Sequence, residues 1–266
     1  MLAITLFLFT LGLCAGSFVN ALVWRLKKKK DWVKSRSQCI NCGHTLSAGD
    51  LVPVLSWLFL RGRCRYCQKP ISAQYPIVEL AGGVVFALSY LLWPQTLDAS
   101  GQWILFTSWI LTSVGLLALL VYDYKWMLLP NGILYPTALV AIAGRLIYTT
   151  WFEPDISASM VRWVLSVAIA SGIFLLIYLV SNGKWIGYGD VRLGIITGTV
   201  LASPSKSFLM IFAASLLGVL YVLPALATGR QKLASKVPFG PFLIVATFIV
   251  LLFGQQIIDW YTGLLT

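Results

Sequence analysis

Residues 2–24 read LAITLFLFTLGLCAGSFVNALVW and are followed at once by RLKKKK at residues 25–30. The first stretch has no charged residue and, as a helix, is long enough to cross roughly 30 Å of hydrocarbon. Its basic cluster follows the apolar run, whereas a secretory signal peptide carries its basic residues in front. The stretch therefore predicts a retained first transmembrane helix with the N-terminus outside.

Apolar runs of the same kind recur along the rest of the chain, in which 59% of the 266 residues are hydrophobic and only 11% are charged. A soluble chain of this length could not bury so much apolar surface. We therefore expect an all-α polytopic membrane protein with about eight transmembrane helices. They lie near residues 2–24, 77–93, 103–122, 133–148, 163–180, 191–202, 208–228 and 239–260. The sixth run is too short for an untilted span and is the least secure.

The net charge of +11 would suggest nucleic-acid binding in a soluble protein, but here the charges are sorted by loop. More than half of the 20 Lys and Arg residues lie between the first two apolar runs, in residues 25–69. The positive-inside rule places this loop in the cytoplasm, where its lysines would contact anionic lipid. We expect a multi-pass protein of the cell inner membrane that contacts membrane lipid and binds no nucleic acid.

Four of the five cysteines form two pairs, Cys39-x-x-Cys42 and Cys64-x-x-Cys67. Each pair can present two thiolates from one turn, and together they give the tetrahedral sulfur coordination of structural zinc. A disulfide is less favoured because the loop is expected in the reducing cytoplasm. We therefore predict a small zinc-ribbon-like insertion whose metal supplies much of its folding free energy. His44, the only histidine, is more often solvated in such a loop than a substitute ligand or a general base.

Two of the nine acidic residues stand where a cytoplasmic loop meets an apolar run. Asp123 ends one run, and Asp190 closes Gly187-Tyr188-Gly189-Asp190 before the next. An ionised carboxylate near hydrocarbon costs several kcal/mol unless it is paired or hydrated, so such residues are functional candidates. The span count puts both at the same depth on the cytoplasmic face.

Two carboxyl groups held close in a low-dielectric pocket share one proton. The ionised partner can withdraw a proton from water while the protonated partner polarises a peptide carbonyl, which is aspartic proteolysis. The glycines Gly187 and Gly189 would let the backbone approach a substrate closely and take up angles barred to other residues. The alternative for each aspartate is a helix cap or an interfacial side chain.

Ordered matches along nearly the whole chain then resemble the bacterial type IV prepilin peptidases, intramembrane-type aspartic proteases of the GxGD class. The matching segments are Gly16-Ser17-Phe18-Val19-Asn20, the cysteine pairs with Arg36-Ser37 and Pro53-Val54-Leu55-Ser56-Trp57, the run from Ile71 to Leu80, the Asp123 segment, Gly187–Arg192 and Pro238-Phe239-Gly240-Pro241-Phe242.

The resemblance implies removal of the basic leader from type IV prepilins or pseudopilins at the cytoplasmic membrane face. Carried over by position, Asp123 and Asp190 are the catalytic pair, and Cys39, Cys42, Cys64 and Cys67 are the zinc ligands. Members with the cysteine loop usually also methylate the new N-terminal residue with S-adenosylmethionine. Glu79 would serve that second reaction or, alternatively, pair with a nearby Arg or Lys.

These expectations divide the chain into a first transmembrane helix (1–24), a cytoplasmic cysteine loop (25–76) and a transmembrane aspartic peptidase core (77–266). The family often has aspartate where this chain has Asn131, and we expect activity to survive because the pair itself is present. Two alternatives remain open. The chain could be a peptidase without methyltransferase activity, or a zinc-bearing membrane transporter or scaffold that uses the aspartates as cation ligands or a proton relay.

Overall fold

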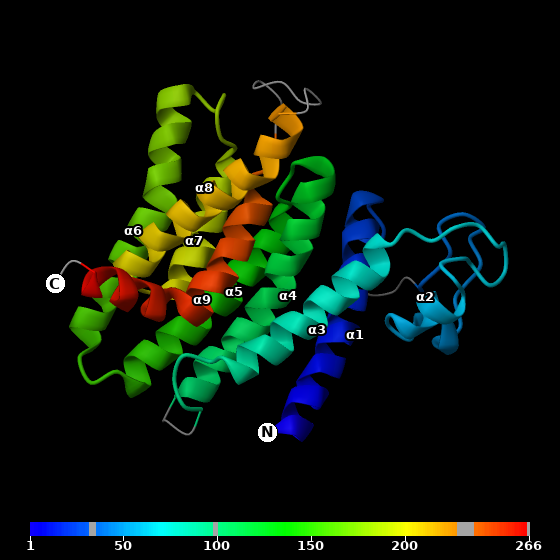
Figure 1. Cartoon of the computed structure of the whole chain (residues 1–266), viewed down its shortest axis with the longest axis horizontal. Coiled ribbons are helices and arrows are strands. Elements are labelled where there is room, and N and C mark those ends of the chain that lie inside the picture. The colour runs from blue at the N-terminus through cyan, green and yellow to red at the C-terminus, as the bar shows by residue number, and fades with distance from the viewer. Residues whose placement is uncertain (32–35, 98–100, 228–236, 265–266) are drawn as a thin grey trace. The chain divides into compact units, whose positions relative to one another are not determined.

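The computed structural model describes residues 1–31, 36–97, 101–227 and 237–264, which are nearly all helical (Figure 1). Its elements are α1 (Leu2–Lys27), the 3-10 helix η1 (Ala48–Leu51), α2 (Leu55–Phe59), α3 (Gln74–Leu91), α4 (Gln102–Trp126), α5 (Asn131–Phe152), α6 (Ile156–Ser181), α7 (Tyr188–Leu201), α8 (Pro204–Ala227) and α9 (Gly240–Gly263). Contacts divide the chain into two compact units, Met1–Leu92 and Trp93–Thr266.

The first unit is built on α1 and α3, which pack closely along their glycines. Gly12 of α1 and Gly82 of α3 face each other backbone to backbone. One turn further along α1, a Cβ atom on Gly16 would lie 2.6 Å from Cα of Glu79. Small residues of this kind let membrane helices approach to backbone contact. The close approach brings polar groups of the two helices together at one end of the pair.

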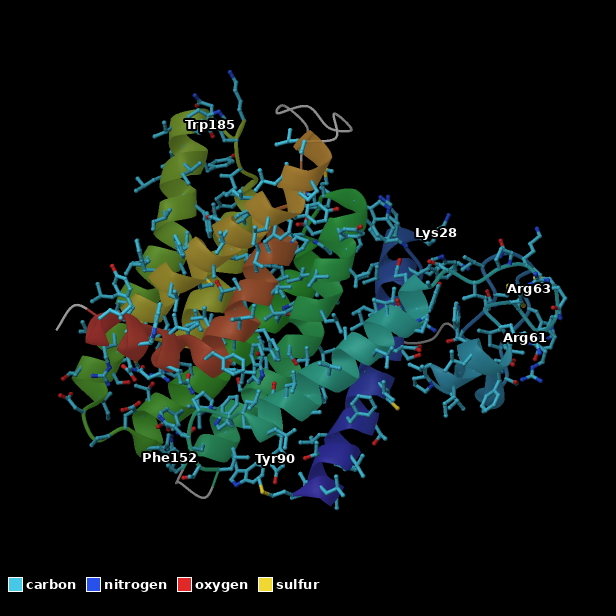
Figure 2. All side chains as sticks on the ribbon, viewed as in Figure 1. Lys28, Arg61, Arg63, Tyr90, Phe152 and Trp185 are labelled. Carbon is cyan, nitrogen blue, oxygen red and sulfur yellow. The ribbon has the colours of Figure 1, made fainter. Side chains whose placement is uncertain are left out.

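The polypeptide between α1 and α3 forms the cysteine loop, which contains η1 and α2. Two isolated antiparallel bridges, Gln38 with Thr45 and Arg63 with Pro70, close one short turn each. Figure 2 shows Arg61 and Arg63 on the outer side of this loop and Lys28 at the end of α1, and all three are exposed. These three basic residues of the predicted cytoplasmic loop are therefore solvated, as expected for surface charges.

The second unit is a bundle of the six helices from α4 to α9 (Figure 1). Helix α4 packs against α5 and α9, and α7 packs against α5, α6 and α9. Both α5 and α9 thus contact the two helices that carry Asp123 and Asp190. The N-terminal ends of α5 and α9 are the elements placed to shape a site between those aspartates.

Seven helices in the described part of the chain are long and apolar enough to cross a membrane: α1, α3, α4, α5, α6, α8 and α9. They account for seven of the eight expected runs and confirm the all-α polytopic fold. The exception is the sixth, residues 191–202, which lies in α7. Helix α7 has 14 residues and spans only about 21 Å at 1.5 Å per residue. Its Gly194 and Gly198 lie against the backbone of α6, so packing on a longer neighbour holds this short helix.

The boundary between the two units follows α3, because α3 packs on α1. The division into a first helix, a cysteine loop and a peptidase core was drawn by function. Contacts between helices do not test it, so it stays a prediction.

Candidate functional site

The sulfur atoms of the four loop cysteines gather at one point of the first unit. All four Sγ atoms lie within 4.8 Å of one another, and those of Cys39 and Cys67 are 3.9 Å apart. Each cysteine is a free thiol. Tetrahedral zinc with Zn–S bonds of about 2.3 Å holds its sulfur atoms about 3.8 Å apart. The cluster therefore fits a four-thiolate zinc ion, as the spacing predicted.

The two cysteine pairs are presented by turns with the same hydrogen-bond pattern. The amide of Gly43 donates to the carbonyl of Cys39, and that of Gln68 donates to Cys64, both at 2.9 Å. Gly43 and Gln68 have positive φ values of 71° and 57°. In the second turn this strained angle falls on glutamine rather than glycine. Such strain is tolerated where the surroundings fix the turn, as a bound metal would.

His44 lies outside the sulfur cluster. The metal-competent group in the described chain consists of the four cysteines, and the His44 ring instead packs on Tyr66 with 3.7 Å between ring centroids. His44 is exposed. It therefore takes the solvated role that we expected.

The Asp50 carboxylate links separate parts of the cysteine loop by hydrogen bonds. Its carboxylate accepts hydrogen bonds from Arg65 Nε at 2.7 Å, from Tyr66 at 3.0 Å and from the amide and hydroxyl of Ser47. Burial acts to raise the pKa of Asp50, but these donors outweigh it and lower the pKa to about 2. The group is ionised at neutral pH, and its acceptor positions are filled.

Glu79 lies on α3 and is buried. Its Oε2 accepts a hydrogen bond of 2.7 Å from the amide of Val54, and Ser17 hydrogen-bonds to the same carboxylate. Among the described residues no ion pair of Glu79 is found, and its two expected roles, serving the second reaction or pairing with a nearby Arg or Lys, stay predictions. A buried acid with two neutral partners retains acceptor capacity, because a carboxylate can accept about four hydrogen bonds.

Asp123 is near the C-terminal end of α4 and is 5% exposed. The helix continues for three residues and ends at Trp126, where Met127 takes a left-handed conformation and its amide donates to the Asp123 carbonyl at 2.7 Å. Helix α5 begins at Asn131 directly after Pro130, so the helical structure is interrupted between Trp126 and Asn131. The Asp123 side chain is therefore buried one turn before the loop that joins α4 to α5.

Asp190 is in the first turn of α7 and is half-buried. The amide of Gly187 donates to its carboxylate. The carboxylates of Asp123 and Asp190 lie close enough for their charges to interact. The structure thus brings together the two aspartates that the sequence placed on one membrane face.

The backbone angles of the two glycines of the Gly187–Asp190 motif differ from those expected. Neither has a positive φ, so the prediction of angles barred to other residues was wrong. Gly187 has an extended backbone before α7. Gly189 packs closely on the loop, because a Cβ atom there would lie 3.1 Å from Cδ1 of Leu129. The loop after α4 therefore packs directly on the first turn of α7.

Arg192 joins the first turns of α5 and α7. Its guanidinium donates to Oδ1 of Asn131 and lies over the Tyr188 ring, 5.1 Å from the centroid. Asn131 therefore keeps a polar contact across the site although it lacks the negative charge of an aspartate. This contact is compatible with the expectation that asparagine is tolerated here.

Gly240, the first residue of α9, is a site residue to which sequence reasoning gave no role. Its amide donates a hydrogen bond to the Asp123 carboxylate. A Cβ atom on Gly240 would lie 2.6 Å from Asp123 Oδ2 and 3.6 Å from Leu193 of α7. The positive end of a 24-residue helix thus faces a catalytic candidate. The sequence feature that could have identified Gly240 is its position between Pro238 and Pro241 at the start of an apolar run.

These features define the class of protein: a multi-pass helical membrane protein with an aspartate pair in one unit and a four-thiolate metal site in the other. Profiles of two families match the chain. The Bacterial Peptidase A24 N-terminal domain matches residues 10–93, and the Type IV leader peptidase family matches residues 110–223, which include both aspartates.

Curated relatives match over nearly the full chain. Proteins named prepilin leader peptidase/N-methyltransferase are 30% identical in Bacillus subtilis (96% of each chain), 30% in Aeromonas hydrophila (95% of this chain, 92% of the relative) and 28% in Stutzerimonas stutzeri (98% and 94%). No solved structure matches the chain. The chain belongs to the type IV leader peptidase family.

Proposed function

We propose that this protein removes the leader peptide from type IV prepilins or pseudopilins and then methylates the new N-terminal residue. The observation that carries the proposal is that Asp123 and Asp190, on two different helices, lie close enough for their charges to interact, within the segment that matches the leader peptidase family. The names of the full-length relatives support both activities.

The aspartate pair acts as the acid and base of peptide hydrolysis. One proton is shared, because two carboxylates in a poorly solvated pocket repel each other when both are ionised. The ionised member takes a proton from water as its oxygen bonds to the scissile carbonyl carbon, and the protonated member gives its proton to the carbonyl oxygen. The carbon–nitrogen bond then breaks as the leaving amine takes a proton from the protonated member and a hydroxyl of the tetrahedral intermediate gives a proton to the ionised member. One water is consumed, and the pair returns to a single shared proton.

Three neighbours orient this pair. Gly240 donates its amide to Asp123, Gly187 donates its amide to Asp190, and Gly189 allows Leu129 to pack against α7. Fixed amide donors hold the carboxylates in one geometry and require no rearrangement during reaction.

Zinc, held by Cys39, Cys42, Cys64 and Cys67, has a structural role in this proposal. The donor set supports it, since four thiolates fill the tetrahedral positions and leave none for water or substrate. When bound, the metal cross-links the two turns of a loop with little apolar core of its own.

S-adenosylmethionine is the methyl donor in this proposal. When bound, it supplies a methyl group whose carbon–sulfur bond breaks as the new N-terminal amine forms a carbon–nitrogen bond; sulfur keeps the electron pair, and the amine releases a proton to water. Glu79 is the candidate residue of the first unit for holding the donor, because it is buried and retains acceptor capacity. The functional division is thus a first helix (1–24), a cysteine loop (25–76) and a peptidase core (77–266).

We place the cysteine loop and both aspartates on the cytoplasmic side of the inner membrane. The distribution of basic residues supports this orientation. The prepilin partner would present its leader at that face, and the exposed lysines at the end of α1 would contact anionic lipid. Family membership does not favour the transporter or scaffold alternative.

The test uses the purified full-length protein in lipid nanodiscs with a type IV prepilin. The mass of the product reports leader removal, and an additional methyl group of about 14 Da reports the second activity. We expect Asp123→Asn and Asp190→Asn each to abolish cleavage, because a pair with only one carboxyl group cannot supply both an acid and a base. Asp259→Asn is the control, since Asp259 is exposed near the end of α9 and bonds to Gln255.

Cleavage at the wild-type rate by either Asp123→Asn or Asp190→Asn would show that the aspartate pair is not catalytic. A cleaved product without added mass, in the presence of the methyl donor, would reduce the function to that of a peptidase.

A further inference from the structure

The short helix α2 of the cysteine loop carries an exposed apolar face. Leu55, Leu58 and Phe59 recur at the spacing of one helix face, and all three are exposed. Phe59 is 83% exposed, the highest value of any aromatic residue in the part of the chain that the structure describes. Leu51 and Val52, which come shortly before α2, are exposed as well. These five residues are called the α2 face below.

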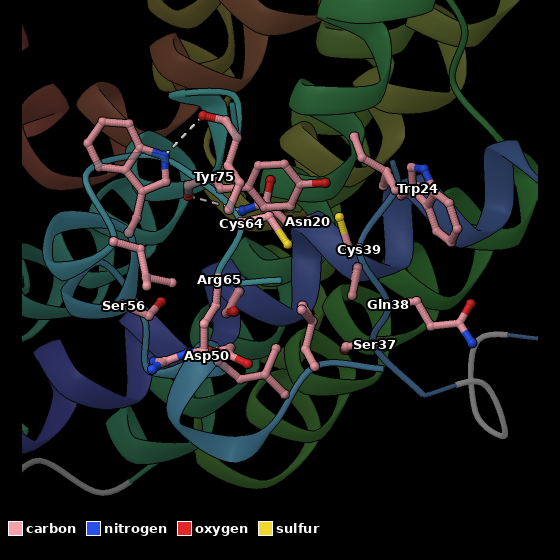
Figure 3. A pocket seen from close by; sticks show the side chains of 18 of the residues that line it. Asn20, Trp24, Ser37, Gln38, Cys39, Asp50, Ser56, Cys64, Arg65 and Tyr75 are labelled. Carbon is pink, nitrogen blue, oxygen red and sulfur yellow. Dashed lines mark hydrogen bonds and ion pairs between the residues drawn. The ribbon is translucent and has the colours of Figure 1, made fainter. Parts of the chain in front are cut away.

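The opposite side of α2 is packed inward. Ser56, Trp57 and Leu60 line a cavity between the loop and the helix pair of α1 and α3, and Figure 3 shows Ser56 on its wall. The indole nitrogen of Trp57 donates to the carbonyl of Ile71 at 3.1 Å, and the Trp57 ring lies against Gly62. Because the inner side is fixed in this way, α2 cannot turn its apolar face inward without breaking these contacts.

Hydrogen bonds fix the depth of α2 relative to α1. The amide of Val54, directly before α2, donates to Oε2 of Glu79 at 2.7 Å, and Ser17 of α1 hydrogen-bonds to the same carboxylate. Ser17 lies seven residues before Trp24, the last residue of the uncharged run. At 1.5 Å per residue this is about 10 Å along the helix. Since tryptophan marks the membrane–water interface, the start of α2 lies near the boundary between lipid headgroups and acyl chains.

Another part of the loop lies at the level of the end of α1. Ser37 accepts a hydrogen bond of 3.5 Å from Arg25, the first charged residue after the uncharged run. Gln38 follows Ser37 and is exposed. Figure 1 shows α2 alongside the pair of α1 and α3, rather than beyond the end at which α1 enters the loop. The loop therefore has a shallow part at Ser37 and Gln38 and a deeper part at α2.

The charges of the loop complement an anionic membrane surface. Arg61 and Arg63 follow α2 within four residues, and both are exposed (Figure 2). The one acidic residue in residues 36–73 is Asp50, whose side chain is 3% exposed. The exposed charges of this segment are thus all basic. Arginines beside an apolar face can bind lipid phosphates while the apolar side chains enter the acyl chains.

We propose that the α2 face is inserted into the cytoplasmic leaflet, where Leu55, Leu58 and Phe59 contact acyl chains and Arg61 and Arg63 bind the phosphates of anionic lipids. A helix of five residues is too short to bind a membrane from solution. Here α1 and α3 hold both ends of the loop at the bilayer, so the contact forms within one molecule at a high effective concentration. The inference uses the orientation given under the proposed function and neither of the two proposed activities.

Two other occupants suit the α2 face less well. A prepilin leader is basic and would meet Arg61 and Arg63, and like charges repel. A second copy of the chain using the same face would bring its own pair of arginines to the contact. An anionic lipid surface offers both the apolar environment and the opposite charge.

The test introduces a photo-crosslinker by Phe59→p-benzoylphenylalanine in the full-length, zinc-loaded protein. The protein is placed in nanodiscs of equal parts phosphatidylglycerol and phosphatidylcholine and irradiated, and the intact mass identifies each adduct. The new side chain is aromatic and uncharged, and zinc content reports an intact loop. Gln38→p-benzoylphenylalanine is the matched control in the same loop. We expect at least about fivefold more lipid adduct at position 59, because position 38 lies outside the acyl chains.

Equal yields of lipid adduct at positions 59 and 38, with full zinc content, would overturn the inference. Crosslinks from position 59 to a second copy of the chain in place of lipid would overturn it as well. So would crosslinks to prepilin in place of lipid when prepilin is added.

The ratio of the two lipid adducts at position 59 tests the role of the arginines. Phosphatidylglycerol adducts should exceed phosphatidylcholine adducts by about twofold or more, because basic residues near the surface attract anionic lipid. Arg61→Gln and Arg63→Gln together should bring the ratio close to one, although the lysines at the end of α1 remain. Arg162→Gln, on α6 in the second unit, is the control and should leave the ratio unchanged. An unchanged ratio in the double variant would show that the two arginines do not bind the lipid.

Discussion

The amide of Gly240 donates a hydrogen bond to the carboxylate of Asp123, and a Cβ atom on Gly240 would lie only 2.6 Å from Asp123 Oδ2. A Cβ atom does not approach a non-bonded atom this closely. Gly240, the first residue of α9, therefore packs directly against the Asp123 carboxylate. Any side chain at position 240 must displace either that carboxylate or α9. This contact links two residues that are 117 positions apart in the sequence.

Gly240→Ala should lower the rate of leader cleavage by on the order of 100-fold, because a displacement of about 1 Å at a reacting group costs such a factor. The measurement is kcat/KM with a prepilin substrate in nanodiscs. Gly263→Ala is the matched control on the same helix, since a Cβ atom there meets nothing within 4 Å. Full activity of Gly240→Ala, with the protein folded, would show that the fit does not position Asp123.

The sequence predicted the parts of the site that depend on local spacing or on counting spans. Two Cys-x-x-Cys pairs specify their own turns, so the sulfur cluster followed from spacing alone. Asp123 and Asp190 were placed together because both follow loops on the same predicted side. Neither inference needs to know how distant helices pack.

What the sequence could not supply depends on packing between distant helices. The role of Gly240 requires the position of α9 against α4, and the contact of Arg192 with Asn131 requires that of α7 against α5. The hydrogen bonds to Glu79 come from Val54 and Ser17, which belong to different parts of the first unit. The length of α7 was uncertain for the same reason. Packing against α6 stabilises this helix, which has only 14 residues and would be a short span by itself.

Cys64→Ser should abolish tight zinc binding and make the cysteine loop sensitive to protease, because bound metal supplies much of the loop's folding free energy. Zinc per chain is measured by elemental mass spectrometry, with about one ion expected in the wild type. Cys14→Ser is the control, because Cys14 is exposed on α1 and lies outside the cluster. Retention of a full zinc ion by Cys64→Ser would mean that the four-thiolate assignment is incorrect.

Asn131→Asp should keep leader cleavage within about threefold of wild type. The new carboxylate would meet the guanidinium of Arg192, and an exposed ion pair of this kind changes stability by only about 0.2–1 kcal/mol. Asn131→Leu should lower the rate more, since it leaves Arg192 without this acceptor beside the aspartate pair. Steady-state kinetics of the two variants test the point; equal rates for both would show that the contact across α5 and α7 has no part in activity.

Gly16→Val should separate α1 from α3, because a Cβ atom at Gly16 would already lie 2.6 Å from Cα of Glu79. Overpacking of this kind costs about 1–3 kcal/mol, and it acts at the residue proposed to hold the methyl donor. We expect a lower thermal unfolding temperature for the first unit together with a loss of S-adenosylmethionine binding of roughly tenfold or more. Gly172→Val on α6 is the control, since a Cβ atom there meets nothing within 4 Å. A folded Gly16→Val variant with wild-type affinity would show that donor binding does not depend on the contact between α1 and α3, and it would remove Glu79 as the candidate for holding the donor.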